Sequence, residues 1–154
     1  IFDAFLDEPD TDSHFRHIST YSGTPVSTAV ALKNIEIIER ENLPARAAET
    51  GDYLMSKLKN LLEHPNVGDV RGKGLLIGIE LVADKESKAP LPDADVAGVT
   101  KRCMEQRVMI GRNATTIPGF GNVLMICPPL ITTDKEADRL ADSLESAIFA
   151  LPKA

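Results

Sequence analysis

The stretch from residue 67 to residue 82 constrains the fold of this chain more than any other. It holds two β-rich segments, 67–71 and 75–82, which are joined by Gly72-Lys73-Gly74. Glycines adopt the positive φ angles that tight turns require, so these three residues predict a turn between two strands. Strands joined so closely run antiparallel, and the apolar second segment is expected in the core of a sheet.

Two helical patterns precede this pair of strands. Thr24 followed by Pro25 is typical of a helix N-terminus, and the pattern continues to about residue 40. The first half of this helix is apolar almost all round, which predicts burial on most sides. A second helix is expected after Asn42, as its N-cap, with Pro44 in its first turn and leucines repeating along one face.

The remaining pattern completes a mixed fold. A helix is expected over 95–106, strands over 108–110 and 123–127, and a last helix after Thr133, which forms a capping box with Glu136. The order α α β β α β β α predicts an α+β fold, in which helices cover a small, mostly antiparallel sheet and a long helix precedes it. We expect three parts: an interface segment (1–23), connecting helices (24–64) and a small α+β domain (65–154).

Composition narrows the possible partners and the compartment. The net charge of −6 and the lack of a basic stripe argue against nucleic-acid binding. No apolar run approaches the roughly 20 residues that span a bilayer, and no signal peptide is visible. Cys103 and Cys127 lie in apolar runs, so we expect reduced, buried thiols and a cytoplasmic protein. Because the first residue is Ile1 and not Met, we expect the chain to begin partway through a longer protein, although trimming or an omitted tag residue would explain this start equally well.

Two features suggest ligand contacts. The segment Ser19-Thr20-Tyr21-Ser22 places hydroxyls before a helix N-terminus, where phosphate binding is favourable, although simple helix capping would explain the same residues. Arg112 follows a predicted strand and opens a long loop, from which a guanidinium can bind a carboxylate with two hydrogen bonds. An ordinary surface arginine is the alternative.

Other candidates are weaker. His14 and His17 are three residues apart, but no acid or thiol nearby completes a ligand set, so no metal site is expected. Glu80 lies in an apolar strand, and we expect it to point outward from an edge strand.

Three blocks of the sequence, taken together and in order, point to one protein family. They are HISTYSGTPVSTAVALKNIEIIERENLPARA, VGDVRGKGLLIGIELV, and VMIGRN followed by NVLMICPPLITTDKEADRLADSLESAI. Together they resemble the C-terminal part of a class-III aminotransferase, a pyridoxal-phosphate (PLP) enzyme of the aspartate-aminotransferase fold, often called an omega-transaminase. The resemblance covers nearly the whole chain.

The resemblance implies an assembly and three site residues. Family members are homodimers with active sites at the subunit interface. The threonine of the TYSG-type block contacts the phosphate of a cofactor bound mainly by the other subunit, which implies this role for Thr20, with Ser19 beside it at the rim of the pocket. In many members an arginine before the PPL segment binds the substrate carboxylate, and Arg112 is the nearest match. Arg71 and its neighbouring glycines are implied to be architectural.

The resemblance also implies that an essential catalytic residue of the family has no counterpart among these 154 residues. The family's Schiff-base lysine lies upstream of the TYSG-type block, and no lysine here matches it. We therefore expect the C-terminal fragment of an aminotransferase that moves an amino group from an amine or amino acid to a 2-oxo acid such as pyruvate, inactive without its large domain and its homodimer partner. The alternative is a stand-alone, non-catalytic α+β module for ligand binding or dimerisation.

Overall fold

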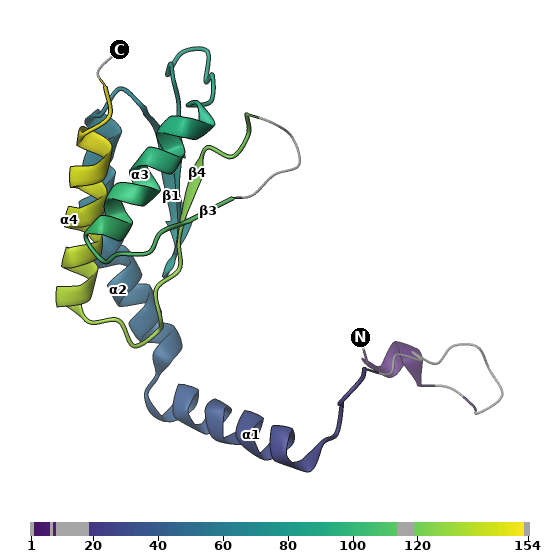
Figure 1. The fold of residues 1–154 in the computed structure, drawn as a ribbon. Coiled ribbons are helices and arrows are strands. Elements are labelled where there is room, and N and C mark those ends of the chain that lie inside the picture. The colour runs from purple at the N-terminus through teal and green to yellow at the C-terminus, as the bar shows by residue number, and fades with distance from the viewer. Residues whose placement is uncertain (1, 7, 9–18, 114–118, 153–154) are drawn as a thin grey trace. The chain divides into compact units, whose positions relative to one another are not determined.

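The computed structural model describes residues 2–6, 8, 19–113 and 119–152 (Figure 1). Internal contacts group the chain into two compact units, residues 1–41 and 42–154. The three-part division expected from the sequence remains a prediction.

The first unit contains a short 3-10 helix, η1 (Phe2–Phe5), and the helix α1 (Pro25–Arg40). The predicted helix start is confirmed, because Thr24 occupies the N-cap position with Pro25 in the first turn. The Thr24 side chain does not cap the helix, however. Its hydroxyl instead donates a hydrogen bond of 2.9 Å to the carbonyl of Tyr21.

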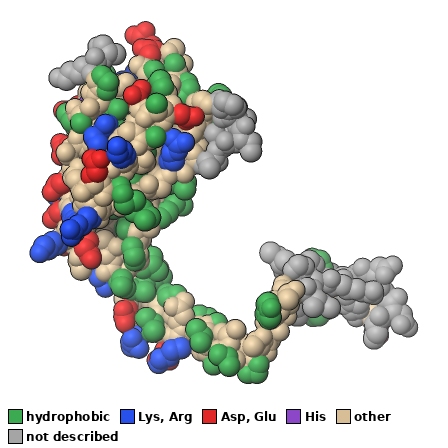
Figure 2. All heavy atoms as spheres, viewed as in Figure 1, with side chains coloured by type: hydrophobic (Ala, Val, Ile, Leu, Met, Phe, Trp, Pro, Cys, Tyr) green, Lys and Arg blue, Asp and Glu red, His purple; other side chains and the backbone are tan. Residues whose placement is uncertain are grey.

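The predicted burial of α1 is wrong for this chain. Not one of its sixteen residues is buried, and Val26 and Val30 are 74% and 64% exposed. Figure 2 shows hydrophobic side chains at the surface of this helix, with charged side chains toward its C-terminal end. The apolar pattern predicts that another protein surface covers this helix. No part of residues 19–41 provides that surface.

The second unit is an α+β domain, which confirms the predicted fold class. Its helices are α2 (Leu43–Leu58), the 3-10 helix η2 (Lys59–Glu63), α3 (Asp93–Glu105) and α4 (Asp134–Phe149). Asn42 occupies the predicted N-cap of α2 but takes a left-handed conformation and gives no side-chain cap. The capping box of α4 is confirmed, because Thr133 accepts a hydrogen bond from the backbone of Glu136 and the Glu136 side chain accepts one from the backbone of Thr133.

The sheet has four strands in the order β1-β2-β4-β3, and every pairing is antiparallel. Its strands are β1 (Val67–Lys73), β2 (Leu76–Leu81), β3 (Gly111–Arg112) and β4 (Val123–Ile126). The predicted strand over 108–110 is misplaced, since pairing with β4 begins only at Gly111. In the predicted turn, Gly74 has a φ of +53°, whereas Gly72 continues β1 and pairs with Ile77.

One face of the sheet carries the core. Alternate residues of β2 point inward, and the helices α2, α3 and α4 cover that face (Figure 1). The central apolar side chains are fully buried and come from all of these elements: Leu54, Leu58, Ile77, Ile79, Leu81, Val96, Leu124, Leu144 and Ile148. The alternation follows from the two-residue period of a strand.

The two cysteines differ in their surroundings. Cys103 is buried as expected, and this burial raises the pKa of its thiol. Cys127 is exposed, which corrects the prediction, because it follows the last paired residue of β4 and lies outside the core. Among the described residues, no helix is long and apolar enough to cross a membrane.

Candidate functional site

The hydroxyl-rich segment forms a tight turn that leads directly into α1. The backbone N–H of Ser22 donates to the carbonyl of Ser19 over 3.1 Å, and Tyr21 and Gly23 have positive φ angles of 67° and 72°. The hydrogen bond from Thr24 to the carbonyl of Tyr21 closes the turn. Gly23 takes this conformation without strain, since it has no Cβ.

Thr20 projects from this turn into solvent. Within the described part of the chain, neither its hydroxyl nor its backbone N–H has a hydrogen-bond partner. The positive end of the α1 dipole follows directly, and both features suit contact with a phosphate oxygen. Residues 19–24 contain no lysine or arginine, so they fit a supplementary contact to a phosphate whose charge is mainly neutralised by other groups.

Arg112 lies in β3, opposite Leu124 of β4. Its Nη1 donates to the backbone carbonyl of Asp93, the first residue of α3, over 3.3 Å, and lies 3.9 Å from the Oδ1 of the same residue. The Arg112 side chain is 37% exposed. Both contacts use one guanidinium nitrogen, so the group keeps further N–H donors for a carboxylate.

Asp93 and Gly121 complete the surroundings of Arg112, and the sequence did not single out either. A Cβ at Gly121 would lie 3.2 Å from Asp93 Oδ1 and 4.0 Å from Arg112 Cζ, so glycine leaves room for this pair. The sequence offers no signal for either residue, because Asp93 precedes the helix predicted over 95–106 and only the structure begins α3 at this residue.

The candidate residues fall into separate units. Ser19 and Thr20 share one turn in residues 1–41, whereas Arg112 belongs to residues 42–154. The roles of all three remain predictions.

Arg71 fits an architectural role in the sheet. Its Nη1 lies 2.8 Å from both Asp69 Oδ2 and Glu80 Oε2, and these hydrogen bonds raise its pKa. Glu80 points outward as predicted, but β2 is a central strand and not the expected edge strand.

No metal site is found in the part of the chain that the structure describes. His14 and His17, the pair considered from the sequence, lie outside the described residues.

Comparison with known proteins identifies the family. The family model for class-III aminotransferases matches residues 4–148. Over 96% of the chain, the sequence is 43% identical to the uncharacterized aminotransferase YhxA of Bacillus subtilis and 42% identical to a taurine–pyruvate aminotransferase of Bilophila wadsworthia. The chain spans about a third of the length of these relatives, 32% and 33% respectively.

Solved structures of aminotransferases are also similar to this chain in fold. An aminotransferase of Bacillus anthracis superimposes with a TM-score of 0.87 at 45% identity, covering 96% of this chain and 33% of that one. A PLP-bound amine transaminase from an uncultivated Pseudomonas species gives a TM-score of 0.81 at 35% identity, covering 93% of this chain and 32% of that one. Sequence and fold therefore lead to one conclusion: the chain belongs to the class-III aminotransferase family.

Proposed function

We propose that this chain is the C-terminal part of a PLP-dependent aminotransferase that transfers an amino group from an amine or amino acid to a 2-oxo acid, with pyruvate as the acceptor. The similarity to aminotransferases over 96% of the chain carries the proposal. Pyruvate is favoured because several relatives at 41–42% identity are named as taurine–pyruvate or hypotaurine/taurine–pyruvate aminotransferases.

The family resemblance suggests the residue roles that we propose, and the local geometry is compatible with them. When bound, PLP supplies the electron sink that amino transfer requires. Thr20, whose hydroxyl and N–H are unengaged among the described residues, holds one phosphate oxygen, with Ser19 beside it. Arg112, which keeps free N–H donors, orients the substrate carboxylate.

The exposed apolar surface of α1 supports the proposed partners. Val26, Val30, Leu32 and Ile35 are each more than half exposed on one helix. Apolar side chains gathered in this way are typical of an interface. We propose that the family's large domain and a homodimer partner cover this helix in the working enzyme.

We further propose that the 154 residues are inactive by themselves. Amino transfer with PLP needs a Schiff-base lysine, and none of the lysines here matches that position in the family.

An assay of the full natural reading frame tests the proposal. The protein product, with PLP, is incubated with pyruvate and a panel of amino donors that includes taurine, and alanine formation is measured. We expect alanine from the full product and none from the 154-residue chain assayed in parallel. A full product that makes no alanine with any donor, together with an intact mass equal to that of this chain, would favour the non-catalytic module instead.

A further inference from the structure

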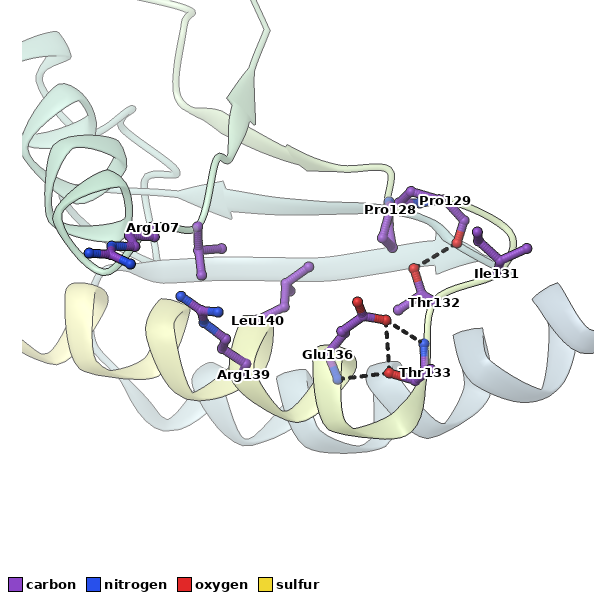
Figure 3. Close-up of a pocket in the computed structure, with 10 residues that line it drawn as sticks. Arg107, Pro128, Pro129, Ile131, Thr132, Thr133, Glu136, Arg139 and Leu140 are labelled. Atoms are coloured by element: carbon purple, nitrogen blue, oxygen red, sulfur yellow. Dashed lines mark hydrogen bonds between the residues drawn. The ribbon is translucent and has the colours of Figure 1, made fainter.

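A pocket of about 460 Å³ lies within the second unit, beside the N-terminal half of α4 (Figure 3). Its floor is apolar and comes from three separate segments: Val108 after α3, Pro128 and Ile131 after β4, and Leu140 of α4. This volume falls in the range of pockets that hold small organic ligands.

Two guanidinium groups lie at one end of the pocket. Figure 3 shows Arg107 and Arg139 together at the end away from Ile131. Arg139 donates from Nη2 to the carbonyl of Gln106 over 3.0 Å, which leaves its other donors available. Among the described residues, the Arg107 side chain has no hydrogen bond or ion pair. This end of the pocket therefore has unused donors and positive charge.

The only carboxylate that lines the pocket does not compensate this charge. Glu136 lies toward the opposite end (Figure 3), where its Oε2 accepts from the backbone N–H and the hydroxyl of Thr133 over 2.9 and 2.8 Å. Because the capping box holds Glu136, the two arginines remain without an acidic partner within the pocket lining.

The backbone of Arg107 adds an independent observation. Its N–H bonds to the carbonyl of Met104, and the next N–H, of Val108, bonds to the carbonyl of Cys103. This is the Schellman motif that ends α3, and Arg107 stands with a φ of +61° at the position that glycine usually occupies. A non-glycine residue in this unfavourable backbone conformation suggests that its side chain has a function.

We propose that this pocket binds a small apolar carboxylate. The carboxylate would lie between the guanidinium groups of Arg107 and Arg139, and the hydrocarbon part would cover Val108, Pro128 and Leu140. A compact aryl-alkanoate fits the combination of an apolar floor with paired cations at one end, because guanidinium groups bind carboxylates with matched pairs of hydrogen bonds. The proposal does not depend on the amino-transfer reaction.

Calorimetric titration of the 154-residue chain with phenylbutyrate tests this site. Phenylbutanol, which has the same ring and chain without the charge, serves as the matched ligand control. Arg107→Gly and Arg107→Ala both remove the guanidinium, and the glycine variant relieves the backbone, so loss of binding cannot be attributed to unfolding. Lys135→Ala removes an equal charge from an exposed position of α4 that does not line the pocket.

We expect phenylbutyrate to bind at least about tenfold more tightly than phenylbutanol, and both Arg107 variants to lose about tenfold in affinity while Lys135→Ala keeps it. Amide chemical-shift changes are expected at Val108 and Leu140. Equal binding of acid and alcohol, unchanged affinity in the Arg107 variants, or no measurable binding of phenylbutyrate to the unmodified chain would each overturn the proposal.

Discussion

Gly51 of α2 lies directly against Gly74, the residue that follows β1 in the turn to β2. A Cβ added to Gly51 would overlap the carbonyl group of Gly74 and come 2.5 Å from its Cα. Because these atoms belong to the backbone, no side-chain rotation can relieve the overlap. We expect Gly51→Ala to destabilise the second unit by about 1–3 kcal/mol, measured by urea unfolding.

Gly98 of α3 provides the matched control for this prediction. It is also a helical glycine, but the nearest atom to its added Cβ is the end of the flexible Arg102 side chain at 3.4 Å. Gly98→Ala is expected to stabilise the protein by about 0.5–1 kcal/mol, from helix propensity alone. Equal effects of the two substitutions would contradict the close contact between Gly51 and Gly74.

The end of α3 leads to a second prediction. Because Arg107 occupies a left-handed position, Arg107→Gly is expected to raise the free energy of unfolding by up to about 1 kcal/mol, after allowance for the greater freedom of glycine in the unfolded chain. Arg107→Ala keeps the unfavourable backbone and should give no gain. Thermal unfolding of both variants measures the difference, and a gain with alanine as large as that with glycine would refute the explanation.

The capping box of α4 predicts a pH dependence. Hydrogen bonds from the backbone and hydroxyl of Thr133 lower the pKa of Glu136 from its ordinary value of 4.5. A carboxyl whose pKa falls on folding stabilises the protein above its unfolded-state pKa, and this stabilisation is lost as the pH falls through the folded-state value. The stability difference between the unmodified chain and Glu136→Gln should therefore be constant above about pH 5 and shrink at lower pH.

Urea unfolding over a series of acidic pH values measures this difference. Glu145→Gln, at an exposed position on the same helix, is the control for the loss of one negative charge outside the capping box. If Glu136→Gln kept the same pH dependence of stability as the unmodified chain, protonation of the capping box would not contribute to the loss of stability at acidic pH.

Thr20 yields a prediction about cofactor retention in the full natural protein. Thr20→Ala removes a hydroxyl that would donate to a charged phosphate, so PLP binding should weaken by about 1.5–3 kcal/mol. Thr20→Ser keeps the hydroxyl and should retain most of the affinity. The cofactor dissociation constant measures both effects, and an unchanged constant in Thr20→Ala would remove this residue from the phosphate site.

Arg112 makes a prediction about substrate selection in the same protein. Arg112→Gln should raise KM about tenfold or more for donors that carry a carboxylate, because a charge-assisted contact is lost. Arg112→Lys should raise KM less than Arg112→Gln but should not restore the original value, since lysine cannot form the paired hydrogen bonds. A carboxylate-free amine is the internal control, and equal effects on both donor types would show that Arg112 acts only on structure.

Much of the second unit could be predicted from the sequence, because its signals are local. The turn between β1 and β2 and the capping box of Thr133 and Glu136 each depend on residues a few positions apart. The position of β3 could not be predicted in this way. A two-residue strand exists only through its pairing with Leu124 and Met125, and its own residues carry no periodic pattern.

The candidate site divides in the same manner. The hydroxyl-rich turn and Arg112 were noticed because their residue types stand out locally, and the family resemblance suggested their roles. Asp93 and Gly121 were missed, because only folding brings residues from α3 and from the segment before β4 beside Arg112.

The sequence by itself determined the family, the fold class and the starts of α1, α2 and α4, since these depend on hydrophobic period, caps and turns within short segments. Only the tertiary structure decided the central place of β2, the exposure of Cys127 and the contact between Gly51 and Gly74. The place of β2 and the contact between Gly51 and Gly74 involve residues that are distant along the chain. The exposure of Cys127 depends on which surface the other elements leave uncovered. The physical reason is that burial and close packing are set by the arrangement of several elements, which no single segment specifies.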